Sequence, residues 1–285
     1  MVSIIIPAHN EEGSIVEVIG SIKEVLGKTD YPYEIIVVDD GSTDRTVERL
    51  RNASPETRII EHGFNKGYGG ALKTGVKSAR YDIIVTFDAD GSHPVDQIPE
   101  MIRRLGDCDM VIGARSGKDD ATQLIRRPPK WVLRKLAEYL SESRIPDLNS
   151  GFRVMRKAVV ERFMRLLPNG FSFSSTITIA MHVNDYRISY MPITCRKRSG
   201  GKSKIRPIRD TLNFLQLIMR TILYFAPLKI FLPLSALLII ASFGVLLYSH
   251  FIIGDILDIT IMGLLVAGIQ VFSIGLLADL IDKRT

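Results

Sequence analysis

The chain contains few cysteines, and several motifs that mark common classes of protein are missing from it. Cys108 and Cys195 are the two cysteines in 285 residues, which excludes a scaffold held together by many disulfides. They lie far apart beside predicted strands, so we expect two free thiols in a reducing compartment, a single disulfide being the alternative. The five histidines have no spacing typical of zinc ligands, and no Cys-x-x-Cys pair occurs. No Gly-x-Gly-x-x-Gly follows the first predicted strand, so a nicotinamide or flavin dinucleotide is not expected.

The N-terminus also lacks the features of a secretory signal peptide. Residues 1–7 form a short apolar run with neither a basic region nor a cleavage site, so we expect the N-terminal part to stay in the cytoplasm. Apolar residues make up 46% of the chain and charged residues 24%, which excludes a disordered or collagen-like protein. The basic run at 126–130 has little aromatic interleaving, and nucleic acid is therefore not an expected partner.

Charge is missing from two long segments near the C-terminus. Ile230–Gly254 and Ile259–Ala278 contain no charged residue, and at about 1.5 Å per residue each can cross a hydrocarbon core of about 30 Å. Only Asp255–Asp258 separates them, which fits a tight turn. Basic residues flank the outer ends of the pair and the turn is acidic, so the positive-inside rule predicts a two-span membrane anchor with both termini in the cytoplasm. The alternative is a buried helical hairpin of a soluble protein.

The segment before the first span has the periodicity of an amphipathic helix. Leu212, Leu215, Met219 and Ile222 recur at spacings of three and four residues, with basic and amide side chains on another face. Two interpretations stay open, a helix lying in the headgroup layer and an ordinary core helix. The predicted organisation is a catalytic domain at 1–205, an amphipathic juxtamembrane helix at 206–227 and a transmembrane hairpin at 228–285.

The N-terminal part alternates short apolar runs with helical segments. The apolar runs predict buried strands at 2–6, 33–38, 57–61, 82–87 and 109–114. The segments between them predict helices at 11–26, 43–51, 67–79 and 95–105. Strands of this kind, each separated by a helix, indicate an α/β fold with a mostly parallel sheet that is buried on both faces. Ligands of such sheets bind beyond the carboxyl ends of the strands.

Two of these strand ends are acidic. Asp88 and Asp90 follow the fourth strand and can both approach one point, as oxygen ligands of a hard cation such as Mg²⁺ or Mn²⁺. Asp39 and Asp40 follow the second strand, where one carboxylate could accept a hydrogen bond from a nucleobase or ribose. An Asp-x-Asp pair alone is more often a turn or a helix cap. Its position level with a second acidic strand end favours a metal site.

Six motifs, in order along the chain, resemble those of a known family. They are Ile4–Glu12, Val37–Asp44, Asn65–Leu72, Phe87–Gly91, Asp147–Arg153 and Arg198–Lys204. The first four resemble the family-two glycosyltransferases, which have the GT-A fold, a Rossmann-like, mostly parallel sheet. The last two resemble a narrower branch, the polyprenyl-phosphate glycosyltransferases, which includes dolichyl-phosphate mannose synthase and dolichyl- or undecaprenyl-phosphate glucosyltransferases. The resemblance covers about residues 2–205.

The resemblance implies roles for individual residues. The residues that it places around the nucleotide are Pro7, His9, Glu11, Asp40 and Asp88. Asp40 is the expected base contact, and Asp88 and Asp90 would hold the Mg²⁺ or Mn²⁺ that bridges the diphosphate. Dolichyl-phosphate mannose synthases often have Gln two places after the second Asp as a further metal ligand. Here that position is Ser92, a weaker oxygen donor.

The reaction implied by the resemblance is transfer of a hexose from a nucleotide-diphosphate sugar, of GDP-mannose or UDP-glucose type, to a polyprenyl (dolichyl) phosphate. This acceptor is already anionic and needs no base to remove a proton. The segment 169–176, where relatives commonly place an acidic residue, contains no Asp or Glu. Two phosphate-bearing substrates need cations to hold them together, and the candidates are Arg115, Arg134, Arg153, Arg198, Lys202 and Lys204.

Within this reaction we expect Arg115 and Arg198 to act together with Asp88 and Asp90 as the catalytic residues. The phosphates, including the lipid phosphate, are expected to contact Arg115, Arg134, Arg198 and Lys204. A single displacement at the anomeric carbon would invert the sugar's configuration.

Three other functions are compatible with parts of the sequence. A family-two transferase acting on a lipid or polysaccharide hydroxyl would need a base. A nucleotidyltransferase typically has a Gly-rich phosphate loop after its first strand, where this chain has His9–Glu12. A non-catalytic membrane scaffold would have no use for the acidic strand ends. The expected partners are the two substrates and the lipid bilayer; the spans could serve one protomer or a homo-oligomer.

Overall fold

The structure is a computed structural model that describes residues 1–115, 145–195, 223, 227–253 and 258–282. The chain divides into two compact units, residues 1–214 and residues 215–285, and each unit is described by itself. Apart from residues 223 and 227, the amphipathic helix predicted at 206–227 lies outside the described residues.

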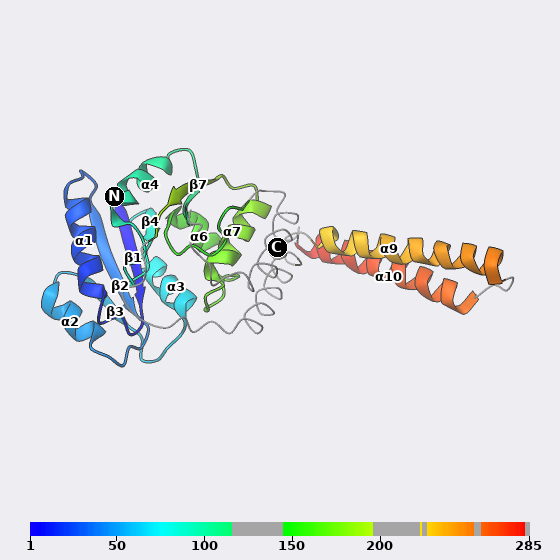
Figure 1. The fold of residues 1–285 in the computed structure, drawn as a ribbon, viewed down its shortest axis with the longest axis horizontal. Helices are drawn as coiled ribbons and strands as arrows, with labels where there is room; N and C mark the ends of the chain where they lie inside the picture. Colours follow the sequence, from blue (N-terminus) through cyan, green and yellow to red (C-terminus); the bar gives the residue numbers. More distant parts are fainter. Residues whose placement is uncertain (116–144, 196–222, 224–226, 254–257, 283–285) are drawn as a thin grey trace. The chain divides into compact units, whose positions relative to one another are not determined.

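The first unit is built on a mixed sheet that has seven strands among the described residues (Figure 1). The strands are β1 (Val2–Ala8), β2 (Tyr33–Asp39), β3 (Arg58–Glu61), β4 (Ile83–Thr86), β5 (Met110–Arg115), β6 (Arg153–Arg156) and β7 (Ile188–Ile193). Their order across the sheet is β3-β2-β1-β4-β6-β5-β7. Neighbouring strands are parallel except at β6, which runs antiparallel to both β4 and β5. The sheet is therefore mostly parallel, as predicted.

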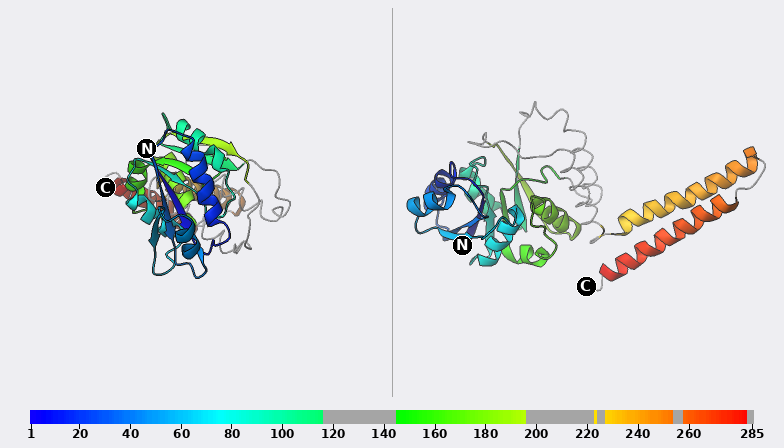
Figure 2. Two further views of the ribbon diagram at one scale, coloured as in Figure 1. Left: turned by 90° about the vertical axis from the view of Figure 1, so that its left-hand side faces the viewer. Right: turned by 90° about the horizontal axis from the view of Figure 1, so that it is seen from below.

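Helices cover both faces of this sheet (Figures 1 and 2). They are α1 (Ile15–Gly27), α2 (Thr46–Ala53), α3 (Tyr68–Ser78), α4 (Ile98–Arg104), α6 (Lys157–Phe163) and α7 (Phe173–Val183), with the 3₁₀ turn η1 (Val95–Gln97) before α4. Side chains of β1 alternate between the two faces. Ile4 and Ile6 join the core cluster that contains Ile19 of α1. Ile5 lies against α3, where a Cβ added to Gly75 would come within 2.3 Å of Ile5 Cγ2. Burial on both faces explains why β1 is a continuous apolar run.

The five strands and four helices predicted from apolar patterning are present, with small differences at their ends. β1 and β2 extend further than predicted because the ladder between them continues to the pair Ala8 and Asp39. The helix predicted at 95–105 is divided into η1 and α4, with a proline in the first turn of α4. The longer β1 and β2 bring the residues that follow them to the same edge of the sheet.

The second unit is a hairpin of two long apolar helices. Its elements are α9 (Leu228–Tyr248), the short π-helix η3 (Ser249–Ile253) and α10 (Asp258–Asp282). The two helices approach closely where Gly268 faces Ile239. A Cβ added to this glycine would lie only 2.7 Å from Ile239 Cγ1, so the close approach requires glycine here. The Ser242 hydroxyl also donates a hydrogen bond across the hairpin to the Ile261 carbonyl, at 2.9 Å. Small residues and an interhelical hydrogen bond are typical of helices that pack within a membrane.

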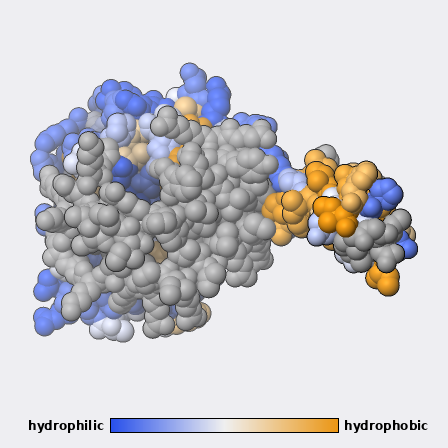
Figure 3. Space-filling view, turned by 45° about the vertical axis from the view of Figure 1, so that its right-hand side comes forward, coloured by the Kyte–Doolittle hydropathy of each residue, from blue (hydrophilic) through white to orange (hydrophobic). Residues whose placement is uncertain are grey.

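The apolar side chains of this hairpin are mostly exposed, and Figure 3 shows hydrophobic residues over its surface. Both helices are long and apolar enough to cross a membrane, and few of their residues are buried. A helix in the core of a soluble protein would instead be mostly buried. The exposure therefore disfavours the alternative of a soluble hairpin, and the two helices are candidate membrane spans.

Candidate active site

The carboxyl ends of β1 and β2 are joined by hydrogen bonds between the loops that follow them. The Asn10 backbone N–H donates to Ser42 Oγ at 2.9 Å, and Asn10 Oδ1 accepts from the Thr43 backbone N–H at 2.8 Å. The Glu11 backbone N–H donates to Thr46 Oγ1 at 2.9 Å. Side-chain oxygens that follow each strand thus accept hydrogen bonds from backbone N–H groups that follow the other. These bonds hold the two strand ends together.

Three residues expected to line the nucleotide lie on or beside this edge. Pro7 is buried within β1, whereas His9 and Glu11 follow the strand and are half-buried. His9 Nδ1 lies 3.0 Å from the backbone carbonyl of Asp40. The structure therefore brings these residues together with the acidic end of β2.

The Asp40 carboxylate is already used by the protein. Its Oδ1 accepts from the Lys66 backbone N–H and lies 2.8 Å from His62 Nδ1, and its Oδ2 accepts from the Gly67 backbone N–H at 2.8 Å. Asp40 is 3% exposed. These bonds attach the end of β2 to the segment that begins α3, a positioning role that the sequence did not indicate.

Asp39 differs from its neighbour. Its Oδ2 accepts from the Ser42 backbone N–H at 3.1 Å, whereas its Oδ1 is buried without a hydrogen-bond partner among the described residues. A buried acceptor without a donor costs about 1–3 kcal/mol. At this strand end, Asp39 Oδ1 is therefore a carboxylate oxygen that no described donor satisfies.

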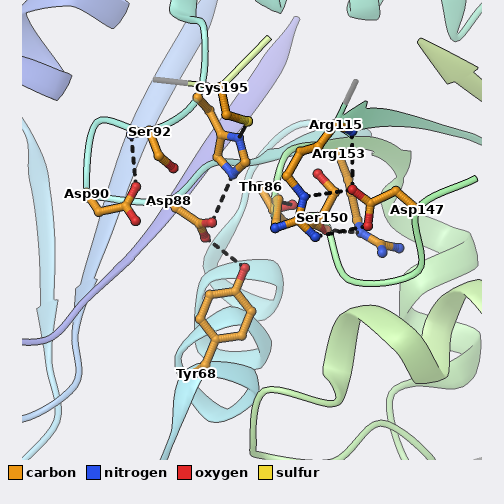
Figure 4. A network of polar contacts seen from close by, with 12 residues as sticks. Tyr68, Thr86, Asp88, Asp90, Ser92, Arg115, Asp147, Ser150, Arg153 and Cys195 are labelled. Atoms are coloured by element: carbon orange, nitrogen blue, oxygen red, sulfur yellow. Dashed lines mark hydrogen bonds and ion pairs between the residues drawn. The ribbon is translucent and has the colours of Figure 1, made fainter. Parts of the chain in front are cut away.

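Asp88 and Asp90 lie just beyond β4, as the sequence predicted (Figure 4). Asp88 Oδ1 accepts a hydrogen bond from the Tyr68 hydroxyl at 3.0 Å, and Asp88 Oδ2 accepts one from His93 Nε2 at 2.9 Å. Asp90 Oδ1 accepts from the Ser92 backbone N–H at 3.0 Å. Both carboxylates are thus oriented by neighbours from α3 and from the loop after β4.

This donor set fits a hard divalent cation that is shared with a substrate. Mg²⁺ and Mn²⁺ prefer oxygen ligands, and nucleotide enzymes often hold them by one or two carboxylates plus substrate phosphates. No group of three or more His, Cys, Asp or Glu side chains in the described part of the chain could enclose a metal. Asp88 and Asp90, with the Ser92 hydroxyl beside them, would therefore supply a partial coordination shell, which suits a cation that arrives with a diphosphate.

The Asp88 carboxylate changes the pKa of the neighbouring His93. Burial by itself lowers the pKa of His93, but its hydrogen bond to the Asp88 carboxylate and the nearby Cys195 sulfur outweigh burial and raise the pKa to about 9. Cys195 Sγ lies 3.6 Å from His93 Nδ1. The described cysteines are not joined to each other, as the sequence predicted.

Arg115 is placed at the same edge, at the end of β5. Its Nε and Nη2 donate to Asp147 Oδ2 and Oδ1 at 2.7 and 3.0 Å, a bidentate pair (Figure 4). The bond to Asp147 raises the pKa of Arg115. Burial raises the pKa of Asp147, but the Arg115 guanidinium outweighs it, so the pKa of this carboxyl is lowered. The Arg115 side chain remains 49% exposed, so one side of the guanidinium can still meet an anion.

Arg153 does not fit the expectation that it contacts a phosphate. Its guanidinium donates to the Ser150 and Leu148 carbonyls at 2.8 and 3.1 Å and to Thr178 Oγ1 at 2.7 Å. It is 1% exposed, and burial lowers its pKa to about 10. Arg153 therefore shapes the segment before β6 from inside the domain, and we withdraw it as a substrate contact.

The remaining predicted cations, Arg134, Arg198, Lys202 and Lys204, lie outside the described residues. Conversely, the structure adds Tyr68, His93 and Asp147 to the site. Each lies inside or next to one of the six sequence motifs, and this position was the only indication of a role that the sequence offered. Their contacts join segments far apart in the sequence, so motif membership alone could not assign them.

Residues 3–164 match the family model described as "Glycosyl transferase family 2", and residues 226–283 match that of the "GtrB C-terminal hairpin". The chain belongs to glycosyl transferase family 2. The candidate site lies within or beside the part of this glycosyltransferase that matches the family model, and α9 and α10 lie within the hairpin match.

Relatives of this glycosyltransferase act on lipid-linked phosphates, according to their names. It is 27% identical to dodecaprenyl-phosphate galacturonate synthase of Rhizobium johnstonii, covering 99% of this chain and 87% of that protein. It is 28% identical to undecaprenyl-phosphate 4-deoxy-4-formamido-L-arabinose transferase of Pseudomonas fluorescens, covering 73% of this chain but 61% of the relative. It is 32% identical to dolichol-phosphate mannosyltransferase of Pyrococcus furiosus, covering 72% of this chain and 59% of the relative. The chain thus spans only about three-fifths of the last two.

Solved structures show the fold. Glucosyl-3-phosphoglycerate synthase of Mycobacterium tuberculosis, in complex with Mn²⁺, UDP-glucose and phosphoglyceric acid, matches with a TM-score of 0.60 at 21% identity. The match covers 78% of this chain and 79% of that one. The glycosyltransferase therefore has the GT-A type of mixed α/β sheet, which confirms the predicted fold class.

Proposed function

We propose that this glycosyltransferase transfers a sugar from a nucleotide-diphosphate donor to a polyprenyl phosphate. The observation that carries the proposal is the presence, in one chain, of the family-two domain and the GtrB-type hairpin. Three relatives whose names specify dodecaprenyl, undecaprenyl and dolichol phosphates support this acceptor class. We further propose a hexose of the GDP-mannose or UDP-glucose type as the transferred sugar.

The carboxylates of the site support an acceptor that is already ionised. Besides Asp88 and Asp90, Figure 4 places Asp147 in this network. Asp147 is a poor base because Arg115 lowers its pKa, and a useful general base needs a pKa near the working pH. A phosphate oxygen needs no deprotonation and can attack the anomeric carbon directly. In-line attack would invert the anomeric configuration, so a product with retained configuration would contradict the proposal.

A divalent cation and the basic residues have complementary tasks in this proposal. Asp88 and Asp90 would hold Mg²⁺ or Mn²⁺, which when bound neutralises charge on the departing diphosphate. The solved neighbour that contains Mn²⁺ and UDP-glucose supports this cofactor class. Arg115 is fixed by Asp147 with about half of its side chain exposed, and we propose that it contacts a phosphate. We keep Arg134, Arg198 and Lys204 as proposed phosphate contacts and Ser92 as a proposed metal ligand.

We propose Asp39, rather than Asp40, as the contact to the nucleobase. The Asp39 Oδ1 acceptor has no partner among the described residues, while the Asp40 carboxylate accepts from Lys66, Gly67 and His62. In Asp39→Asn one side-chain oxygen becomes a donor, so the residue can no longer accept from both Ser42 and the base. Loss of one hydrogen bond to a charged group is worth about 1.5–3 kcal/mol, and we expect nucleotide affinity to fall by about 10-fold or more. Isothermal titration with UDP and GDP measures this.

Asp40→Asn is the matched comparison for that variant. Because it would disturb the bonds to the start of α3, we expect a lower melting temperature as its main effect. If Asp40→Asn impaired nucleotide binding selectively and Asp39→Asn did not, the base contact would return to Asp40.

We propose that α9 and α10 span the membrane with both termini in the cytoplasm. The hairpin match and the exposed apolar surface support a membrane location. The orientation is supported by the basic residues at the outer ends of the hairpin, Lys229, Lys283 and Arg284, because the turn at 255–258 has none. A green fluorescent protein fused after residue 285 should therefore fluoresce, whereas alkaline phosphatase fused at the same point should be inactive. The reverse pattern would place the C-terminus outside.

The transferase reaction is tested with the purified full chain. Labelled UDP- and GDP-sugars are offered to a polyprenyl phosphate with Mg²⁺ or Mn²⁺, and parallel samples contain EDTA. The expected result is an acid-labile lipid product from one donor that disappears with EDTA. Transfer to lipid or glycan hydroxyls, with none to the phosphate, would replace the proposed acceptor by the hydroxyl alternative.

A further inference from the structure

Three segments far apart in the sequence meet at the Asp88 carboxylate. Tyr68, at the start of α3, donates to Oδ1, and His93, in the loop after β4, donates to Oδ2. The third is Gly151, which precedes β6; a Cβ added to it would lie 2.5 and 2.4 Å from Asp88 Oδ1 and Oδ2. Figure 4 shows Tyr68 and Asp88 facing each other in this network. Asp88 is therefore enclosed by two donors and a backbone wall.

We infer that Tyr68 and His93 are positioning residues that fix the Asp88 carboxylate for a divalent cation. A carboxylate has about four lone-pair sites. Two hydrogen bonds, one to each oxygen, use two of these sites and set the plane of the group. The orientation required of a metal ligand is then present before the cation arrives.

The two donors are themselves held in place, which a positioning role requires. The Tyr68 ring stacks on Phe171, with ring centroids 5.6 Å apart and planes 16° from parallel. The His93 ring packs against Phe87 and Phe152, with centroid distances of 5.7 and 5.8 Å. Neither donor can turn away from Asp88 without losing these contacts. The orientation of the carboxylate is thus built into the packing of the domain.

The inference rests on the proposed function in one respect, that Asp88 binds Mg²⁺ or Mn²⁺. Partners that hydrogen-bond to metal ligands typically contribute about 10- to 100-fold to metal affinity or activity. A residue that only supports the fold would change stability instead. Metal affinity and stability therefore separate the two roles.

The experiment titrates Mn²⁺ into the purified full chain, alone and with UDP or GDP, and follows free Mn²⁺ by electron paramagnetic resonance. We expect Tyr68→Phe and His93→Leu each to weaken Mn²⁺ binding by about 10-fold or more. His93→Gln keeps an N–H donor at a similar position and should restore most of the affinity. Turnover of Tyr68→Phe should recover when Mn²⁺ is raised to saturation.

Tyr186→Phe is the matched control, because the Tyr186 hydroxyl accepts from Arg162 Nη1 at 3.0 Å and has no contact with Asp88. It should bind Mn²⁺ like the unchanged chain. If the unchanged chain binds Mn²⁺ and both Tyr68→Phe and His93→Leu bind it equally well, the positioning role is wrong while the metal site stands. If the unchanged chain binds no Mn²⁺ under any of these conditions, the metal site and this inference both fail. A His93→Gln variant as weak as His93→Leu would remove the role of the His93 hydrogen bond.

Discussion

Asp90→Asn should lower turnover by about 10³-fold, which corresponds to about 4 kcal/mol of transition-state stabilisation. Asp90 lies in the turn after β4, is 8% exposed, and accepts a hydrogen bond from the Ser92 backbone N–H at 3.0 Å. Asparagine keeps an oxygen for that bond but removes the negative charge that a divalent cation requires. The loss should therefore fall on catalysis, with little effect on folding.

Initial rates measured across a range of Mg²⁺ and Mn²⁺ concentrations test this expectation. The melting temperature of Asp90→Asn should stay close to that of the unchanged chain, because a buried charge has been removed without losing its hydrogen-bond acceptor. Asp107→Asn is the matched control, since Asp107 is an exposed carboxylate beyond the end of α4. An Asp90→Asn enzyme as active as this control would move the metal site away from the end of β4.

The parallel strands could be predicted because their physical cause is local. β1 is buried on both faces, so its residues must be apolar on both, and the run Ile4–Ile6 is recognisable as a strand from the sequence itself. β6 has no such apolar pattern. It has four residues, Arg153–Arg156, with arginine at each end, and it becomes a strand because β4 and β5 pair with it on either side. A short strand whose formation depends on distant partners cannot be recognised from its own residues.

The acidic strand ends were predictable as a group but not in detail. Asp39 and Asp40 are adjacent and chemically identical, and only the fold decides that the second faces the backbone N–H groups of Lys66 and Gly67. The buried position of Arg153 could not be predicted either, for a different reason. Arginine is seldom buried, so a surface role was the natural expectation. The fold supplies backbone carbonyls and Thr178 to satisfy its guanidinium, and nothing near it in the sequence reveals those partners.

Gly151→Ala should reduce turnover by about 10²-fold, the scale expected when a reacting group is misplaced by about 1 Å. Its new Cβ would lie 2.4 Å from Asp88 Oδ2, closer than any stable contact. Gly151 is held in turn, because its carbonyl accepts a hydrogen bond from Thr86 Oγ1 at 2.7 Å. Relief must therefore come from rotation of Asp88, which strains its bonds to Tyr68 and His93.

Gly20→Ala is the matched control, because Gly20 is exposed on α1 and an added Cβ would meet nothing within 4 Å. We expect this control to keep full activity and to gain about 0.5–1 kcal/mol of stability from the helix preference of alanine. Full activity of Gly151→Ala would show that Asp88 tolerates displacement and is not bound as tightly as its contacts indicate.

The double variant Gly151→Ala with Tyr68→Phe tests the mechanism of that loss. Without the Tyr68 hydroxyl, Asp88 loses one of the hydrogen bonds that oppose its rotation, so adding the methyl group should cost less than it does in the unchanged chain. The two losses should therefore be non-additive, as for residues that act on one shared partner. Kinetics of the four chains at one fixed, subsaturating Mn²⁺ concentration give the coupling. Losses that simply multiply would mean that Gly151 and Tyr68 affect activity independently, through something other than the orientation of Asp88.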